Sequence, residues 1–193
     1  MKIRLAALLA CMALSAPLAA QQFDTISFGV DGGYPPFDVL APSGEITGFD
    51  IDIANALCTQ LKAKCVFVKQ PFESMIAALN AHKFDAIIAS LNITDERKKE
   101  VDFTDRYYRS GAQLVARKGS PLLPDAASLK GKTVGVQTGS THDAFAKANW
   151  ANHGVKIVGY ANQDNVYLDL LSGRIDASLQ DNIQAATGFI DTP

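Results

Sequence analysis

Residues that would indicate a metal site or a repeat protein are scarce in this sequence. The 193 residues include 3 cysteines and 3 histidines, and the histidines, His82, His142 and His153, are scattered. A zinc site needs Cys or His ligands close together, so we do not expect a bound metal. No internal repeat or low-complexity tract is visible either, which argues against a repeat architecture.

Long hydrophobic runs are also lacking. Lys2 and Arg4 precede an apolar stretch at 5–14, and small residues at 16–20 follow it. A transmembrane helix needs about 20 apolar residues, whereas this arrangement is typical of a cleavable secretory signal peptide. We therefore expect residues 1–20 to be removed on export, so that the mature chain begins at the next residue.

Charge of one sign is not in excess. The chain has 18 basic and 20 acidic residues, a formal charge of −2. Loss of Lys2 and Arg4 with the signal peptide takes 2 from the 18 basic residues, leaving 16 against 20 acidic ones and a charge of −4. Neither balance suggests a nucleic-acid partner or binding to an anionic membrane surface.

Only two cysteines, Cys58 and Cys65, remain if Cys11 is lost with the signal peptide. An exported chain meets an oxidising compartment, so we predict that these two form a disulfide. The alternative, a metal site, would need further Cys or His residues nearby. The bridge would join a helix end to the next strand, and closing so short a loop stabilises a fold by about 2.5 kcal/mol.

Strand-like and helix-like segments alternate along the first half of the mature chain. In the clearest helical segment, Ile53, Ala54, Leu57, Cys58 and Leu61 recur at three- and four-residue spacing. An alternating series of this kind implies a parallel sheet flanked by helices. The predicted series is strand 25–30, helix 50–61, strand 65–68, helix 73–81 and strand 85–89.

The pattern changes after Arg97, where two extended stretches, 101–104 and 112–116, indicate a crossing from one lobe to another. A second series follows it: strand 133–137, helix 142–152, strand 156–160, helix 164–171, strand 177–179 and a helix from about 182. We therefore expect an α/β fold of two lobes, with residues 21–108 in the first and 109–193 in the second.

Polar residues follow four of the predicted strands. In open α/β sheets, ligands bind beyond the carboxyl ends of the strands, so functional side chains are expected at these positions. The four segments are Asp31–Phe37, Ser90–Arg97, Thr138–Thr141 and Gln180–Asp181.

Taken together, several segments resemble the polar amino-acid-binding proteins of ATP-driven importers, especially the lysine/arginine/ornithine, histidine and arginine binders. The resemblance covers nearly the whole mature chain. It is carried by GFDID at 48–52, Cys58 with Cys65, SLNITDER at 90–97, GKTVGV at 131–136 and GRIDA at 173–177.

This resemblance implies the two-lobed periplasmic-binding-protein type II fold. It also implies a monomeric periplasmic protein that captures a polar, most readily basic, amino acid and delivers it to the membrane permease of an ABC importer. Members of the family return from the second lobe to the first and add a strand and helices there. The sequence ends before such a return, so we expect a chain truncated at its C-terminus.

The resemblance also implies a site for a free amino acid, whose two charges can be buried only against opposite charges. Arg97 then binds the carboxylate through its planar fork, helped by backbone N–H groups at Asn92 and Thr141. Asp181 receives the α-ammonium, together with the Ser90 carbonyl and the Asn92 side chain. From the residues alone, Arg97 could instead lie on a solvated helix face, and Asp181 could merely cap a helix.

Tyr34 and Phe72 correspond to aromatic walls around the ligand side chain, and Asp31 corresponds to the acid that meets a distal cation. Other interpretations stay open for each of them: Phe72 could belong to the core, Tyr34 to a turn, and Asp31 to an Asx-turn. Ser140 with Thr141 could form only a helix N-cap, although the free N–H groups of a capped helix also suit an anion.

Three residues differ from the commonest pattern among the basic amino-acid binders. Ala89 stands where a serine is frequent, Gln137 where an aliphatic residue often packs on the ligand, and His142 where glutamine is common. Gln137 could serve a guanidinium group or an amino-acid derivative such as an opine. The identity of the ligand therefore stays open.

Two other functions are compatible with the sequence. Exported dehydratases share this fold, and Asp31 and Asp181 could act as acid and base. The sequence shows no Ser-His-Asp set, metal cluster or phosphate loop, so we expect no catalytic residues and no cofactor. A ligand-sensing receptor domain is the second alternative, and it would need a transmembrane or signalling segment.

Overall fold

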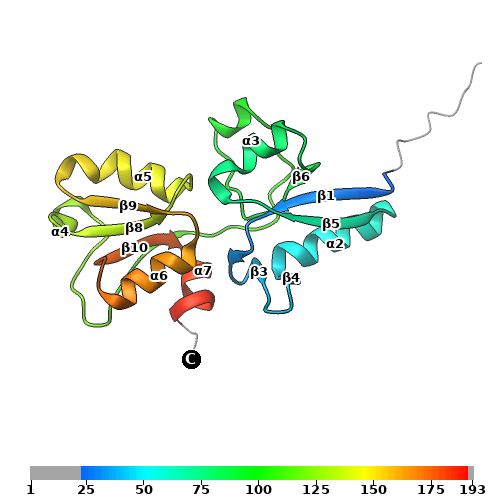
Figure 1. Ribbon diagram of the computed structural model, residues 1–193. Coiled ribbons are helices and arrows are strands. Elements are labelled where there is room, and N and C mark those ends of the chain that lie inside the picture. Colours follow the sequence, from blue (N-terminus) through cyan, green and yellow to red (C-terminus); the bar gives the residue numbers. More distant parts are fainter. Residues whose placement is uncertain (1–22, 191–193) are drawn as a thin grey trace, which may run out of the picture.

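The computed structural model describes residues 23–190, which form two α/β lobes joined by an extended segment (Figure 1). The predicted signal peptide lies outside these residues. Within the described part of the chain, no helix is long and apolar enough to cross a membrane. The first lobe contains β1 (Thr25–Val30), β2 (Gly33–Tyr34), β3 (Asp38–Leu40), β4 (Ile46–Thr47), α2 (Phe49–Leu61), β5 (Lys64–Lys69), α3 (Met75–Asn80) and β6 (Ala86–Ile87).

The main sheet of the first lobe has the order β5-β1-β6, and all its strands are parallel. This confirms the alternating series predicted from the sequence. The third strand is shorter than the predicted 85–89, since only Ala86 and Ile87 pair with β1. Ile88 still donates its N–H to Gly29, but Ser90 adopts a φ of 52°, and this left-handed backbone turns the chain away from the sheet.

Apolar side chains cover both faces of this sheet, as expected for a parallel sheet. On one face the core consists of Phe28, Val30, Ile51, Ala54, Cys58 and Ile88. On the other it consists of Met75, Ala78, Phe84 and Ala89. Helix α2 therefore packs on one side and α3, with its preceding 3₁₀ turn at Phe72–Ser74, packs on the other.

A small antiparallel sheet, β2-β3-β4, was not predicted from the sequence. Its strands have only two or three residues, too few for an alternating pattern to be recognised. The sheet follows β1 directly and leads the chain to the start of α2, so it positions Tyr34 and Asp38 next to the junction of the lobes.

The second lobe has a four-stranded sheet of order β7-β10-β8-β9. Strands β8, β9 and β10 are parallel, as predicted, whereas β7 runs antiparallel to β10. The elements are β7 (Ala112–Ala116), α4 (Ala126–Leu129), β8 (Thr133–Gln137), α5 (Thr141–Asn149), β9 (Lys156–Tyr160), α6 (Gln163–Ser172), β10 (Ala177–Asp181) and α7 (Asn182–Ala185). Helix α5 is shorter than the predicted 142–152 because the chain tightens into a 3₁₀ turn at Ala151–His153.

Two apolar clusters again cover the two faces of the sheet. Leu129, Val134, Val136, Ala146, Trp150, Val155, Ala177 and Leu179 form one. Val115, Val166, Leu170, Ile175 and Ala185 form the other. Each lobe thus has its own core, and hydrogen bonds of polar side chains link the two lobes.

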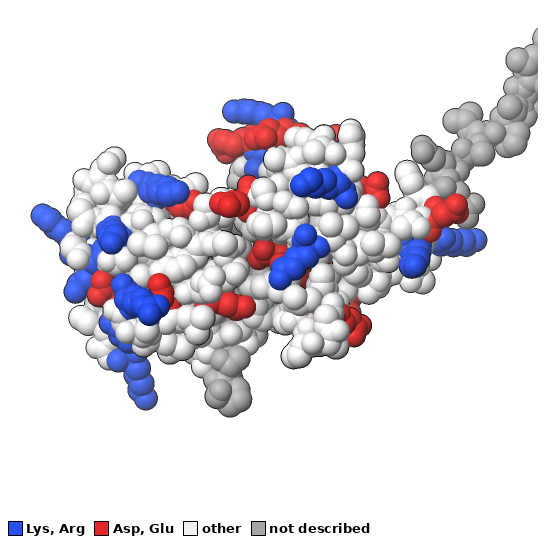
Figure 2. All heavy atoms as spheres, viewed as in Figure 1, with Lys and Arg blue, Asp and Glu red and all other residues white. Residues whose placement is uncertain are grey.

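The crossing between the lobes runs through residues 101–111, which form no strand in the structure. The predicted extended stretch at 101–104 is therefore not part of a sheet. Aromatic rings hold the crossing to the first lobe: Tyr108 stacks on Phe37 with centroids 4.7 Å apart, and Tyr107 stacks on Phe49 at 6.1 Å. On the face shown in Figure 2, acidic and basic side chains occur over both lobes.

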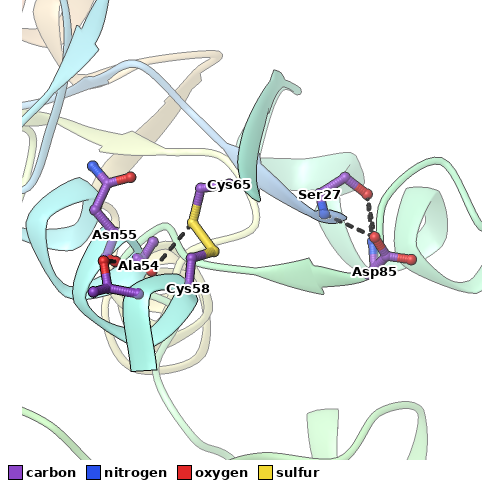
Figure 3. Close-up of a disulfide and its surroundings, with 7 residues drawn as sticks. Ser27, Ala54, Asn55, Cys58, Cys65 and Asp85 are labelled. Carbon is purple, nitrogen blue, oxygen red and sulfur yellow. Dashed lines mark hydrogen bonds between the residues drawn. A yellow bond between two sulfur atoms is a disulfide. The ribbon is translucent and has the colours of Figure 1, made fainter. Parts of the chain in front are cut away.

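The predicted disulfide is present. Cys58, near the end of α2, is bonded to Cys65 at the start of β5, and their Cα atoms are 5.8 Å apart (Figure 3). The bridge closes the turn between a helix and the next strand, beside the core of the first lobe.

Replacing both Cys58 and Cys65 with Ala should lower the free energy of unfolding by about 2.5 kcal/mol, because the unfolded chain regains the freedom of a short loop. Urea denaturation of the oxidised wild type and the double variant measures this difference. The reduced wild type is the matched control and should resemble the variant. Equal midpoints for oxidised and reduced wild type would contradict the expected stabilisation.

Candidate functional site

Polar side chains from both lobes meet at the carboxyl ends of β1, β6, β8 and β10. They surround a cavity of about 20 Å³, which has room for little more than a water molecule. Its lining consists of Asp31, Tyr34, Phe72, Ser90, Asn92, Gln137, Ser140, Thr141, His142 and Asp181. All nine predicted site residues except Arg97 are in this set, and Arg97 lies at its edge.

Asp181 is a buried acid of the second lobe, and only 6% of its surface is exposed. Its carboxylate accepts a hydrogen bond of 2.5 Å from the Tyr34 hydroxyl of the first lobe. Although Asp181 precedes α7, its side chain makes no capping hydrogen bond, so the capping alternative is wrong. Burial, and then the charge of Asp181, raise the pKa of Tyr34, which keeps its hydroxyl a donor.

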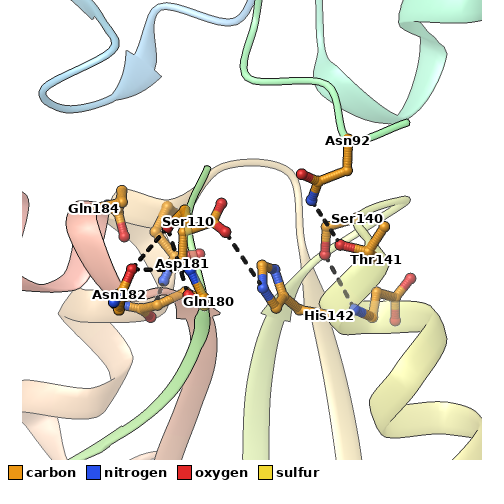
Figure 4. Close-up of polar contacts among 12 residues, drawn as sticks. Asn92, Ser110, Ser140, Thr141, His142, Gln180, Asp181, Asn182 and Gln184 are labelled. Atoms are coloured by element: carbon orange, nitrogen blue, oxygen red, sulfur yellow. Dashed lines mark hydrogen bonds and ion pairs between the residues drawn. The ribbon is translucent and has the colours of Figure 1, made fainter. Parts of the chain in front are cut away.

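His142 is the second neighbour of Asp181. Its Nε2 lies 3.7 Å from the Asp181 carboxylate, at the first turn of α5 (Figure 4). Burial lowers the pKa of His142, while the charge of Asp181 acts in the opposite direction. A helix N-terminus also disfavours a cation. His142 is therefore neutral near pH 7, and protonation would place a positive charge against Asp181.

Arg97 links the two lobes on the opposite side of the site. Its guanidinium donates to the carbonyl of Asn92 at 2.7 Å and to the carbonyl of Gly139, in the second lobe, at 2.9 Å. The guanidinium carbon also lies 5.8 Å from the centre of the Phe72 ring. Arg97 is half-buried, so it does not lie on a freely solvated helix face.

The loop before α5 brings backbone N–H groups to this side of the site. Ser140 caps the helix by accepting a hydrogen bond from the N–H of Asp143 at 3.1 Å, so the N-cap that the sequence left open is formed. Thr141 accepts a 2.9 Å hydrogen bond from the Asn92 side chain across the junction (Figure 4). Gly139 has a φ of +77°, and a Cβ there would lie 3.0 Å from the Cα of Glu73, so a glycine allows the lobes to approach closely.

Asp31 and Gln137 form a third contact between the lobes. The Gln137 amide donates to Asp31 at 2.9 Å, and both side chains are buried. Burial raises the pKa of Asp31, while the bond from Gln137 and the charge of Lys69 lower it. From the sequence, Gln137 was considered only as a group that could serve a guanidinium ligand, and His142 only as a departure from the family pattern. Their positions at the end of β8 and at the start of α5 were the signal that could have identified them as site residues.

Two further buried acids, Asp38 and Asp50, lie behind the site in the first lobe, and neither is exposed. Asp38 accepts the N–H of Gly32 at 2.9 Å with one oxygen, while its other oxygen has no hydrogen-bond partner in the described part of the chain. Burial, followed by the charges of Asp31 and Asp50, raises the pKa of Asp38 to about 7. Asp38 is therefore substantially protonated at neutral pH.

A larger cavity, of about 500 Å³, lies beside β6 and the crossing segment. It meets the site only at its rim, through Ser90, Asn92 and Thr141. Among residues 23–190, no group of three or more His, Cys, Asp or Glu side chains is arranged to hold a metal ion.

Two lobes with separate cores, with charged side chains of both meeting between them, are the architecture typical of two-lobed ligand-binding proteins. Comparison with known families makes this specific. Residues 26–185 match the model of the bacterial extracellular solute-binding proteins, family 3, and the chain belongs to this family. The resemblance inferred from the sequence motifs is thereby confirmed.

Curated relatives include binding proteins for basic amino acids. The chain is 47% identical over 170 residues to the lysine/arginine/ornithine-binding periplasmic protein of Escherichia coli K12. The matched region covers 88% of this chain and 65% of the relative. It is 46% identical over 168 residues to the histidine-binding periplasmic protein of Salmonella typhimurium LT2, with 87% and 65% covered. The chain thus spans about 65% of the length of these relatives.

Solved structures of related proteins have the same fold as this chain. An ancestral arginine-binding protein bound to arginine superposes with a TM-score of 0.82 at 39% identity, covering 85% of this chain and 73% of that one. An ancestral amino acid-binding protein, described as a precursor of cyclohexadienyl dehydratase, gives 0.79 at 36% identity, covering 84% and 72%. The two-lobed fold of periplasmic amino-acid-binding proteins predicted from the sequence is therefore confirmed.

The raised pKa of Asp38 predicts a pH-dependent stability. Between its ordinary value of 3.8 and about 7, folded Asp38 holds a proton that the unfolded chain has released. Raising the pH through this window therefore lowers the free energy of unfolding, with a limiting slope of about 1.4 kcal/mol per pH unit. Asp38→Asn carries no such proton, so it should be more stable than the wild type at pH 8.

Urea denaturation of both proteins between pH 4 and 8 tests this expectation. Other titrating groups are common to both, so the difference between the two curves isolates Asp38. Asp52→Asn, which changes an exposed acid of α2, should run parallel to the wild type. A constant difference between Asp38→Asn and the wild type at every pH would contradict the assignment.

Proposed function

We propose that this chain is the binding component of an ABC importer, which captures an amino acid with a cationic side chain between its lobes. The observation that carries the proposal is the meeting of Arg97, Asp181 and Asp31 at one junction. These groups match the carboxylate, the α-ammonium and the distal cation of such a ligand. The permease of the importer is the proposed partner.

The zwitterionic part of the ligand supplies the first argument. Arg97 offers a planar fork of N–H donors, and the N–H groups at the start of α5 lie on the same side of the site. Asp181 is buried on the opposite side and its carboxylate faces Tyr34 and His142. One fixed cation and one fixed anion therefore satisfy both charges of a bound amino acid.

The distal part of the ligand supplies the second argument. Asp31 is a buried acid, and Tyr34 and Phe72 line the same cavity. A cationic side chain between aromatic rings gains about 0.5–2 kcal/mol from cation–π attraction, in addition to its pairing with the acid. Gln137 adds an amide that can form a hydrogen bond with the polar end of the ligand. In the structure, this amide already donates a hydrogen bond to the Asp31 carboxylate.

Binding must exchange these contacts for contacts with the ligand. The cavity of about 20 Å³ is too small for an amino acid, and the bonds Tyr34–Asp181 and Gln137–Asp31 occupy two of the proposed ligand groups. We infer that the lobes separate to admit the ligand and close again over it, with the crossing segment as the hinge. The proposed boundary of the lobes is at 108/109, just before β7.

The two curated relatives named above are periplasmic proteins by name, which supports the export part of the proposal. We propose that residues 1–20 are a cleavable signal peptide and that the mature protein is a periplasmic monomer.

An enzymatic function is the second candidate, because one structural neighbour is described as the precursor of a dehydratase. Asp31 and Asp181 would then be the acid and the base. We favour binding, because Arg97 and Asp181 suit a zwitterion without any reaction and because the curated relatives named above are binding proteins. Recovery of the unaltered amino acid after incubation with the protein distinguishes the two functions.

A panel of amino acids tests the ligand class. Arginine, lysine, ornithine and histidine should raise the thermal stability of the purified protein more than glutamate, leucine or glutamine. A ligand at 100 times its dissociation constant stabilises a protein by about 2.7 kcal/mol.

Asp31→Asn should weaken the binding of the cationic ligands selectively, because it removes the charge and keeps the shape of the side chain. Preference for an acidic or aliphatic ligand, or equal weakening of all ligands, would contradict the role of Asp31.

The role of Arg97 has its own test. Arg97→Ala should weaken binding of the best ligand by roughly 3–5 kcal/mol, because the buried carboxylate then lacks its cation. Arg97→Lys should restore only part of the loss, since an ammonium lacks the planar fork. Lys98→Ala, which removes a more exposed neighbouring cation, is the matched control and should bind normally. Calorimetry gives all four affinities, and near-normal binding by folded Arg97→Ala would exclude it as the anchor.

A further inference from the structure

Asp50, in the GFDID motif, has no role in the site described above, yet its carboxylate is fully buried and bound by three donors. One oxygen accepts the backbone N–H of Ser90 at 2.7 Å and the Ser90 hydroxyl at 3.1 Å. The other accepts the hydroxyl of Tyr107 at 3.0 Å. Ser90 lines the proposed ligand site, and Tyr107 belongs to the crossing segment.

Ser90 has an unusual backbone conformation. Among the described residues other than glycine, only Lys62, His82 and Ser90 have a positive φ. Lys62 caps the end of α2, and His82 lies in the turn after α3, where such values are common. Ser90 instead follows a strand and leads into the site. A left-handed conformation is strained for a non-glycine residue, so surrounding contacts must maintain it.

Asp50 is itself held firmly in place. The N–H groups of Phe49 and Asp50 donate to the carbonyls of Pro36 and Phe37, at 3.0 and 2.9 Å. Gly48 has a φ of +126°, and a Cβ at this position would lie 2.4 Å from the Phe37 carbonyl oxygen. Only glycine allows this approach, so the start of α2 is fixed against the loop that carries Tyr34.

Electrostatics agree with an acceptor role for Asp50. Burial raises its pKa, but hydrogen bonds from Tyr107 and Ser90 act in the opposite direction. A carboxylate that receives three donors needs no counter-ion, because these donors stabilise its charge.

We propose that Asp50 is a positioning residue of the amino-acid site. It holds Ser90 in the left-handed conformation in which Ser90 lines the ammonium side, and it ties that loop to Tyr107 of the crossing segment. The proposal rests on the proposed function for its binding readout. Its structural half, the hold on Ser90, is independent of any ligand.

The first test replaces the carboxylate. Asp50→Ala should weaken arginine binding by about ten- to a hundredfold, which is the effect of losing hydrogen bonds to a charged group. Asp50→Asn should retain most of the affinity, because its amide oxygen can still accept from Ser90 and its NH₂ can donate to the Tyr107 oxygen. Asp52→Asn, an exposed acid on the same helix, should bind like the wild type.

The second test is rescue at residue 90. Glycine adopts a positive φ without strain, so Ser90→Gly should recover most of the affinity that Asp50→Ala loses. If Asp50→Ala alone does not fold, the double variant Asp50→Ala/Ser90→Gly should both fold and bind arginine. A double variant that does not fold, or that binds no better than Asp50→Ala, overturns the proposal.

A ligand-free readout separates this proposal from the proposed function. Hydrogen exchange of the Ser90 amide, followed by NMR, should be slow in the wild type and much faster in Asp50→Ala. If the wild type binds no basic amino acid but the exchange difference is present, the proposed function fails and the hold on Ser90 stands. Equal Ser90 exchange in wild type and Asp50→Ala overturns the hold, whatever the affinities.

Discussion

Buried carboxylates that accept hydrogen bonds from the opposite lobe hold the two lobes of this protein together. Asp181 of the second lobe accepts the hydroxyl of Tyr34 from the first, and Asp31 of the first lobe accepts the amide of Gln137 from the second. An ionised carboxylate is costly to bury unless such donors meet it. Because the two cores are separate and apolar, these polar contacts, together with Arg97 on Gly139, decide how the lobes meet.

The same groups are those that we propose to bind the ligand, and this has an energetic consequence. An amino acid must displace the Tyr34 and Gln137 donors before its own ammonium and side chain can replace them. The affinity is therefore a difference between two sets of hydrogen bonds, of which only the surplus counts. A ligand with a cationic end gains most, since a charge replaces the neutral amide of Gln137 at Asp31.

Of the two acids behind the site, we propose that Asp50 keeps the walls of the site rigid. Asp50 connects the start of α2, the loop at Ser90 and the crossing segment through one carboxylate. Asp38, between Asp31 and Asp50, avoids a third adjacent charge by holding a proton up to about pH 7. Fixed groups of this kind reduce the entropy that a site loses when its ligand binds.

The sequence by itself determined the alternating strands and helices and the Cys58–Cys65 pair, because periodicity and chain order are local properties. Its resemblance to a known family supplied eight of the ten residues around the cavity. It missed the two- and three-residue strands of β2-β3-β4, which are too short to show a period. Only the tertiary structure decided that Gln137 and His142 contact Asp31 and Asp181, that Asp181 does not cap α7 through its side chain, and that the pKa of Asp38 is raised to about 7. These properties depend on which groups from distant parts of the chain are buried together. Burial and the charges of neighbouring groups arise only when the lobes pack, whereas periodicity is already present in the sequence.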